Sequence, residues 1–539
     1  MLSVVLRIWR RLMALDNAQL TPELRWNFGH LYLDIAGFGI LAGSAMAFIS
    51  VFAARQGATG IQIGLLSGGP AIVSLLMSLP TGRWLEGQVL TRTVFVTSIW
   101  NRAGYAVLVI LPWLLPPSAQ VWAIPVVIML MSIPGTLISI AFNAMFADVV
   151  PPAWRALVVG RRSAVLAVCM TIASLTSGLL LDRLPFPLNY QLVFFIGVLG
   201  AALSSYHLWF LRPMSAAPAR VGRPILDAAQ PGSLRLVDTL RTSLGLRFLT
   251  RAHGKPLLRL DLLRGPFGSM LAAYLFFYLF QAMPVPLFPL FWVRNLHLTD
   301  GQISLAAALV NAATLISSLY LVRISNRRGH HWVLVVGAAF YGVYPLLTGL
   351  AWDVTLIWAA SLLGGGIWGL ASGGLVNRLM ERVPEDDRPA HMALHNLVLN
   401  LAILVGSLAG PVLGDWLGLR TALLLSAGLR VLAALLLARW GCASPARWIP
   451  KKATSTRVDR WRCHHATLEW LGRRLDHLSA LPSSRPLLRG ADGARAAPAR
   501  RKLAGRSRRR GSTAVRQAHR TGPELVEGLA PAPPSPGFQ

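Results

Sequence analysis

The sequence predicts an all-α polytopic membrane protein with twelve transmembrane helices, arranged as two parallel six-helix repeats. Of its 539 residues, 54% are hydrophobic and only 14% are charged, and the mean hydropathy is +0.52. The apolar residues occur in continuous runs and not in the stripes of amphipathic helices. A run of about 20 apolar residues is long enough to cross a bilayer, so these runs predict membrane-spanning helices.

Twelve apolar runs follow one another along the chain, each long enough to cross a hydrocarbon core of ~30 Å with some tilt. Pro284, Pro286 and Pro289 interrupt the seventh run and predict a kinked or broken helix there. The runs cover residues 28–54, 60–82, 92–115, 119–147, 160–182, 189–211, 267–293, 301–323, 332–351, 354–380, 389–414 and 421–440.

The basic residues predict the orientation of these spans. The net charge is +30, and Lys and Arg gather in the loops on one side, among them the adjacent pair Arg161 and Arg162. The loops on the other side hold only Arg55, Arg183, Arg294 and Arg420. Because cytoplasmic loops carry an excess of Lys and Arg, we expect both termini in the cytoplasm and the protein in the inner (plasma) membrane of a prokaryote.

The same reading divides the chain into five parts. The basic excess in the loops and the tail predicts contact with anionic lipid headgroups and not with nucleic acid. We expect the protein to be a monomer. The parts are an N-terminal cytoplasmic or interfacial helix (1–26), an N-terminal six-helix bundle (27–211), a cytoplasmic central loop (212–266), a C-terminal six-helix bundle (267–440) and a basic, disordered cytoplasmic tail (441–539).

Short motifs recur in the two halves. The stretch GIQIG at 60–64 opens the second span, and GQIS at 301–304 opens the eighth. After spans four and ten, an acid, a proline and an arginine recur at the same spacing, as Asp148, Pro151 and Arg155 and as Glu381, Pro384 and Arg388. Because six is an even number of crossings, both halves enter the membrane in the same direction, which predicts a parallel repeat.

These features resemble the major facilitator superfamily over about residues 25–440. The family's loop after span two typically reads G-x-x-x-D-R-x-G-R-R. In the first half Gly82 and Glu86 match it, but the basic pair is reduced to Arg92. In the second half Arg327 and Gly329 match, Asn326 stands in place of the Asp, and two histidines replace the final basic pair. The chain lacks the span-four arginine and the span-five motif of proton-coupled drug exporters. A related string with Gly406, Gly410 and Gly414 lies in span eleven instead.

Several kinds of chemistry are excluded or disfavoured. There is no G-x-x-x-x-G-K-[ST] loop, so transport would follow a gradient and not ATP hydrolysis by that route. Cys169, Cys442 and Cys463 form no disulfide or zinc pattern, and we expect no metal and no cofactor. His30 and Asp34 are spaced H-x-x-x-D and not the H-x-x-x-x-D of acyltransferases, so we do not expect an enzyme.

Asp34 is the acid well inside the first span, and it is the first candidate for coupling. Acids within a span cost a few kcal/mol unless they are paired or hydrated, so they mark functional sites. His30 lies one helical turn away, and Arg102 lies at a similar depth in span three. Either Asp34 couples or gates proton movement, tuned by His30 or Arg102, or a static Asp34–Arg102 pair fixes helix packing.

The resemblance implies that spans one, four, seven and ten line a transport cavity, flanked by spans eight and eleven. Their neutral polar and aromatic side chains favour a neutral, amphipathic or lipophilic cargo, although each could instead bond a neighbouring helix. The cavity candidates are Asn143, Tyr274, Tyr278, Gln281, Asn311, Trp368, Asn377 and Asn400. The candidates for a latch between the inner loops are Glu86, Arg92, Arg155, Asn326, Arg327 and Arg388.

The sequence therefore predicts a secondary transporter of a small organic solute that works by alternating access. Proton coupling is one option, and we favour efflux over uptake. Two other functions remain open, a membrane sensor that does not transport and a membrane-embedded transferase on the same fold.

Overall fold

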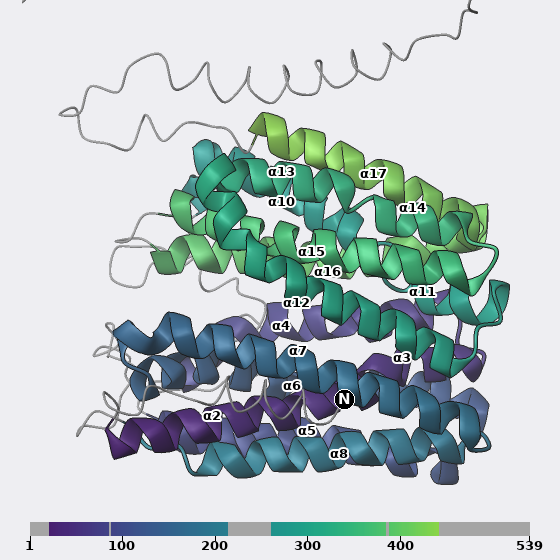
Figure 1. Cartoon of the computed structure of the whole chain (residues 1–539), viewed down its shortest axis with the longest axis horizontal. Coiled ribbons are helices and arrows are strands. Elements are labelled where there is room, and N and C mark those ends of the chain that lie inside the picture. Colours follow the sequence, from purple (N-terminus) through teal and green to yellow (C-terminus); the bar gives the residue numbers. More distant parts are fainter. Residues whose placement is uncertain (1–20, 86–87, 214–259, 384–387, 441–539) are drawn as a thin grey trace, which may run out of the picture. The chain divides into compact units, whose positions relative to one another are not determined.

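The computed structural model describes residues 21–85, 88–213, 260–383 and 388–440. Twelve helices in these residues are long and apolar enough to cross a membrane, as the sequence predicts, and the described residues contain no β-strand. The predicted N-terminal surface helix, most of the central loop and the basic tail lie outside the described residues. Figure 1 shows the helices of the two halves as a purple-to-blue group and a teal-to-green group.

The first bundle begins with a span in three segments, α2 (Pro22–Leu41), a π-helical turn η1 (Ala42–Met46) and α3 (Ala47–Arg55). Thr21 caps α2, because its side chain accepts a hydrogen bond from the backbone N–H of Leu24 at 3.4 Å. The other five spans are α4 (Gly60–Trp84), α5 (Leu90–Leu114), α6 (Pro117–Val149), α7 (Pro152–Arg183) and α8 (Leu188–Trp209).

The second bundle follows a short 3-10 helix, η3 (Leu260–Arg264). Its seventh span comprises α10 (Pro266–Ala282), α11 (Leu287–Leu290) and the π-helical η4 (Phe291–Asn295), so the predicted break is confirmed. The eighth span is α12 (Asp300–Arg328), capped by Thr299 and Gln302 in a capping box. The remaining spans are α13 (His330–Phe340) with α14 (Val343–Leu350), α15 (Val354–Arg382), α16 (Arg388–Leu417) and α17 (Leu419–Trp440).

Equivalent helices pack against each other in the two bundles. In the first, α2 contacts α7 and α8, while α5 contacts α6 and α8. In the second, α10 contacts α16 and α17, while α13 contacts α15 and α17. These are the same pairs of spans, shifted by six, so the repeat extends from the sequence to the packing.

Most of the contact between the bundles is made by two helix pairs, α4 with α16 and α7 with α12, and α3 also contacts α11 and η4. Small residues allow this contact, because a Cβ on Gly64 would meet the carbonyl oxygen of Ser407 at 2.6 Å and a Cβ on Gly178 would meet the Cβ of Ser304 at 2.3 Å. The glycine string of span eleven packs against the seventh span of its own bundle, since a Cβ on Gly406 would meet the carbonyl oxygen of Leu279 at 2.5 Å.

The ninth span is broken between Phe340 and Val343, a break that the sequence analysis did not predict. Pro345 has no N–H to donate to the carbonyl of Tyr341, and Pro284 has none for the carbonyl of Phe280 in the seventh span. Buried Arg430 of α17 occupies both carbonyls, with Nη1 at 3.0 Å from Tyr341 and Nε at 3.4 Å from Phe280. One arginine therefore satisfies the backbone at both breaks.

Candidate functional site

A buried cluster of charged and hydroxyl side chains links four helices of the first bundle. Arg162 of α7 donates from Nη2 to Oδ2 of Asp34 in α2 at 3.2 Å. Ser204 of α8 donates to the other carboxylate oxygen at 2.5 Å. Arg102 of α5 lies 3.9 Å from the same oxygen and donates to Ser204 at 2.7 Å. Asp34 is thus held by three neighbouring helices, and not by Arg102 alone.

Arg162 is the member of this cluster that the sequence analysis placed in an inner loop. In the structure α7 starts at Pro152, so Arg162 lies ten residues further along the helix, about 15 Å from its start. Its guanidinium also stacks on the ring of Phe142 at 4.6 Å. The predicted run began at residue 160, so Arg162 stood at its edge and was counted with the loop charges, whereas the helix begins at Pro152.

His30 does not contact Asp34 through any hydrogen bond found among the described residues. Its Nδ1 instead lies 3.0 Å from Nδ1 of His207 in α8, and its ring stacks on Phe210 at 5.1 Å. His30 therefore belongs to an aromatic group at the end of the bundle where α2 begins, while Asp34 belongs to the arginine cluster.

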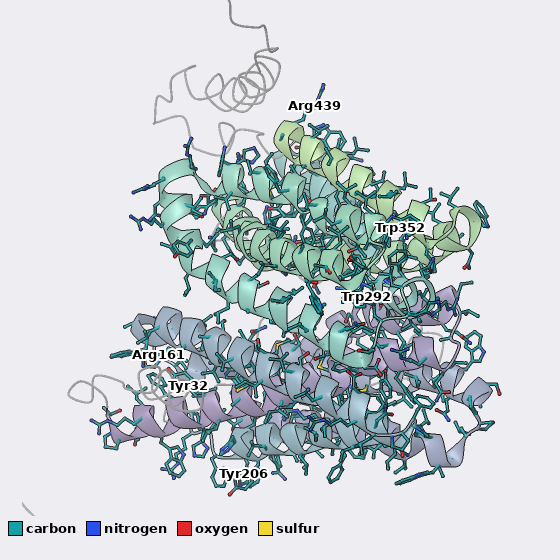
Figure 2. The ribbon with its side chains drawn as sticks, turned by 45° about the vertical axis from the view of Figure 1, so that its right-hand side comes forward. Tyr32, Arg161, Tyr206, Trp292, Trp352 and Arg439 are labelled. Carbon is teal, nitrogen blue, oxygen red and sulfur yellow. The ribbon has the colours of Figure 1, made fainter. Side chains whose placement is uncertain are left out.

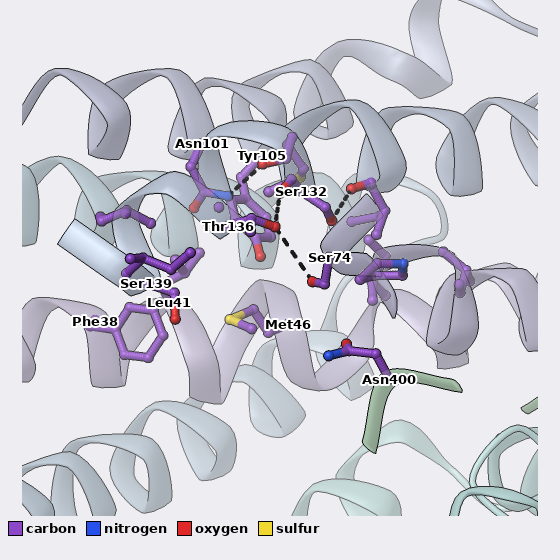
Figure 3. Close-up of a pocket in the computed structure, with 18 of the residues that line it drawn as sticks. Phe38, Leu41, Met46, Ser74, Asn101, Tyr105, Ser132, Thr136, Ser139 and Asn400 are labelled. Carbon is purple, nitrogen blue, oxygen red and sulfur yellow. Dashed lines mark hydrogen bonds between the residues drawn. The ribbon is translucent and has the colours of Figure 1, made fainter. Parts of the chain in front are cut away.

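A cavity of about 620 Å³ lies between the bundles. Pro70 of α4, Asn101 of α5 and Ser132 of α6 line it near the middle of their helices, and Asn396 and Asn400 of α16 close it from the second bundle. Figure 3 shows Asn400 reaching toward the cavity from the second bundle, opposite Met46 and Ser74. The residues that the structure describes in this lining carry hydroxyl and amide groups, and none of them is Asp, Glu, Lys, Arg or His.

Hydrogen bonds fix several of these polar groups to the wall. Thr136 and Ser74 join α6 to α4 through their hydroxyls at 3.4 Å, and the Asn101 amide donates to the carbonyl oxygen of Met131 at 2.7 Å (Figure 3). The Asn101 carbonyl oxygen makes no hydrogen bond to the described residues that would fix it. The wall of the cavity is thus neutral. Some of its polar side chains are fixed by hydrogen bonds to neighbouring helices, and others can donate to or accept from a bound solute.

Of the eight residues predicted to line the cavity, Asn400 does so and Asn143 lines a smaller neighbouring pocket. Tyr274 and Tyr278 are buried inside the second bundle, where they bond the carbonyl of Leu375 at 3.1 Å and Nε2 of His395 at 2.9 Å. Trp368 stacks on Tyr341 at 5.0 Å. Gln281, Asn311 and Asn377 are partly buried and line neither of the two pockets.

The structure describes the latch candidates only in part. Glu86 lies outside the described residues, and Arg388 begins α16 with a side chain that is not described. Arg92, Asn326 and Arg327 are exposed at their helix ends. Arg155 donates to the carbonyls of Ala147 and Val150 at 2.7 and 3.0 Å, which caps the C-terminus of α6. Their role as a latch stays a prediction.

The adjoining Gly329 has a clearer local role. It connects α12 to α13 with φ at +83°, a left-handed conformation that glycine adopts without strain. This conformation gives a physical reason for the glycine in the second copy of the loop motif.

At the opposite end of the helices, polar contacts join the two bundles. Arg55 at the end of α3 binds Asp300 at the start of α12, with Nη2 at 2.9 Å from Oδ1. Asp182 of α7 accepts hydrogen bonds from the Gly301 N–H at 2.9 Å and from the Thr299 hydroxyl at 3.2 Å. The sequence analysis did not choose these residues; the acid near the end of span five and the capping box of span eight were the available signals.

The described residues contain twelve helices that are long and apolar enough to cross a membrane, in two bundles with the same packing and with a cavity between them. These features define a multi-pass membrane protein of the transporter class. The Major Facilitator Superfamily model matches residues 33–263 and 270–501, and the chain belongs to this family. Membership of this family assigns the chain to membrane transport. Among curated proteins, none matches the sequence.

Several solved structures share the fold. A variant of the nucleoside transporter NupG has 12% identity and a TM-score of 0.56, over 77% of this chain and 99% of that one. A bacterial homologue of the iron transporter ferroportin in an inward-facing state has 14% identity and a TM-score of 0.56, over 78% of this chain and 100% of that one. A D-xylose–proton symporter has 14% identity and a TM-score of 0.55, over 80% of this chain and 99% of that one. Their cargoes differ in kind, so the fold alone does not identify the cargo.

Proposed function

We propose that the protein is a secondary active transporter that carries a small organic solute by alternating access. The observation that carries this proposal is the cavity of about 620 Å³, which lies near the middle of the helices and is lined from both bundles. Its volume suits a small molecule, and its uncharged hydroxyl and amide lining suits an amphipathic one. A site between two repeats near the membrane midplane is where alternating access requires it.

The contacts between the bundles support an arrangement that is closed at one end. Arg55 with Asp300, Asp182 with Gly301, and Arg294 with the carbonyl of Ala58 at 2.6 Å all lie at the end opposite to the basic loops. We propose that the basic end faces the cytoplasm, as its Lys and Arg content predicts. The structure would then correspond to an inward-facing state in the inner (plasma) membrane, with both termini cytoplasmic.

We further propose that Asp34 couples proton movement to transport. Because Arg102 and Arg162 share its carboxylate, a change of charge at Asp34 would alter the contacts that hold α2, α5 and α7 together. His30 contributes through His207 and α8, because it contacts that helix and not Asp34.

Flux of solutes in proteoliposomes tests the proposed function. The purified full chain is reconstituted, and accumulation of radiolabelled amphipathic solutes is followed with an inward or an outward proton gradient. Accumulation driven by one gradient would establish transport and its direction, with efflux favoured. If no solute in a broad panel crosses faster than in empty liposomes, the protein does not transport.

A further inference from the structure

A second pocket of about 210 Å³ lies between α2, α6 and α7. Arg162, Ser163, Asn143 and the rings of Phe142 and Phe146 are in its wall. It is next to the main cavity, because the Asn143 amide donates to the carbonyl of Ser139 at 3.0 Å and Ser139 lines that cavity. Unlike the main cavity, this pocket therefore has a cationic group in its wall.

Two buried donors close to this pocket have no acceptor among the described residues, Nη1 of Arg162 and the hydroxyl of Tyr32, whose oxygen is within hydrogen-bonding reach of Arg161. Arg161 and Arg162 both lie close enough to Tyr32 to interact with it electrostatically. Tyr32 and Arg161 lie toward the same end of the first bundle in Figure 2. Because a buried donor without an acceptor costs about 1–3 kcal/mol, two such donors side by side indicate a missing acceptor.

The charges of the cluster indicate which kind of acceptor is missing. Arg102 and Arg162 share the single carboxylate of Asp34, which leaves one positive charge in excess. Arg102 is further bonded to Ser204, Ser205 and the carbonyl of Ala201. The remaining capacity is on Arg162, whose Nη2 binds Asp34 while its Nη1 is unpaired. An anion would satisfy both the free donors and the excess charge.

We propose that this pocket binds the carboxylate of an amphipathic organic anion, whose apolar part lies against Phe142 and Phe146. The carboxylate bonds Nη1 of Arg162 and the Tyr32 hydroxyl once the phenyl rings, which cover the guanidinium and line the pocket, turn aside. Ser163 supplies a further donor at the wall. This inference rests on the proposed transport function and specifies its cargo class as organic monocarboxylates.

Calorimetric titration of the purified full chain in nanodiscs of zwitterionic lipid tests the proposal. The probes are benzoate, its uncharged counterpart benzamide and inorganic phosphate. We expect benzoate to bind at least about tenfold more tightly than benzamide, since a hydrogen bond to a charged group contributes about that factor. Phosphate should bind more weakly than benzoate, because it has no apolar part.

Three variants localise the binding. Arg162→Gln should weaken benzoate at least about tenfold, and Tyr32→Phe, which removes only the hydroxyl, should weaken it a few-fold, while benzamide changes in neither. Arg439→Gln removes an exposed arginine at the end of α17 and should bind benzoate as the parent does. Should Arg162→Gln fail to fold, Tyr32→Phe decides.

Three results would overturn the proposal: equal affinity for benzoate and benzamide, phosphate binding as tight as benzoate binding, or unchanged benzoate affinity in Arg162→Gln and Tyr32→Phe. Phosphate binding as tight as that of benzoate would indicate a site for an inorganic phosphate or a lipid headgroup. Because binding is measured without flux, a protein that binds benzoate but transports nothing contradicts the proposed function and leaves the anion site standing.

Discussion

Asp34 accepts a hydrogen bond from Arg162 at 3.2 Å while Arg102 lies 3.9 Å away, so one carboxylate is shared by two arginines from different helices. Its neighbour Ser204 adds a fourth helix. Replacing a carboxylate in such a position leaves two buried guanidinium groups without a counter-charge. The cluster therefore combines a structural role with the proposed coupling role, and an experiment has to separate the two.

Replacement of Asp34 by Asn should abolish accumulation driven by a proton gradient but leave downhill exchange measurable. The amide keeps the shape of the side chain but cannot carry the proton. Loss of a buried counter-charge costs about 3–5 kcal/mol, so the thermal stability should also fall. The measurement is a pair of proteoliposome assays on one preparation, with and without the gradient.

The two assays distinguish coupling from packing. If Asp34 only fixes the helices, accumulation and exchange should decline by the same factor, in proportion to the loss of folded protein. Gradient-driven accumulation at the parental rate in Asp34→Asn would rule out the coupling role. Ser204→Ala is the matched control, because it removes a hydrogen bond to the same carboxylate and keeps the charge.

Replacement of Gly178 by Val should prevent the bundles from closing at the end opposite to the basic loops. A Cβ on Gly178 would meet the Cβ of Ser304 at 2.3 Å, so the added side chain acts as a wedge between α7 and α12. We expect flux to fall at least about tenfold, because the closed state becomes inaccessible. Gly428→Val is the control, since nothing lies within 4 Å of a Cβ at that position.

Labelling of a single cysteine shows whether Gly178→Val opens the contact between the two bundles. A cysteine at Ser407, which is buried against α4, is introduced after replacement of Cys169, Cys442 and Cys463. An impermeant maleimide added from the side of Asp300 should modify it with Gly178→Val present and not with Gly428→Val. Equal protection in both variants, with normal flux, would show that α7 and α12 need not pack closely.

The sequence predicted the helices well because a span must be long and apolar to cross the membrane, and this property is local. The repeated loop motifs likewise predicted two equivalent halves. The break of the seventh span followed from Pro284 and Pro286. The break of the ninth span was missed, although Pro345 is visible, because a proline alone does not predict a break: Pro125, Pro134 and Pro411 lie inside helices that continue past them. The donor to the freed carbonyl of Tyr341 is Arg430, far along the chain.

The site was harder to predict, because it depends on how each helix is rotated and on where it starts. Asp34 and Arg102 were found from their depth. Arg162 was counted with the loop charges, because it lies at the very start of the predicted run 160–182, whereas α7 begins at Pro152. Asn400 and Asn377 look alike in sequence, yet Asn400 lines the main cavity and Asn377 does not. Depth along a helix can be read from spacing, whereas the side that faces a cavity is set by packing.

Asn400 and Asn377 therefore make a matched pair for testing the cavity. Asn400→Leu should raise KM for the transported solute about tenfold or more, because it replaces a hydrogen-bonding amide in the wall with an apolar side chain. Asn377→Leu should change KM less than about twofold. The measurement is initial flux against solute concentration. An equal rise in KM for both variants would place the solute outside the cavity between α6 and α16.

Arg430→Gln should reduce stability without changing solute affinity. Arg430 is 2% exposed and donates to the carbonyls of Phe280, Gln281 and Tyr341, which belong to the interrupted seventh and ninth spans. The shorter glutamine reaches fewer of them, and the unpaired carbonyls cost about 2–4 kcal/mol in total. Thermal unfolding in detergent should show a lower Tm, and flux of the remaining folded protein should show the parental KM. Arg420→Gln is the control: it removes an arginine that bonds one carbonyl, Ala351, at 2.9 Å, and should lower the Tm less. A raised KM with an unchanged Tm would instead assign Arg430 to solute binding, since the loss of a purely structural contact cannot weaken binding while the fold stays equally stable.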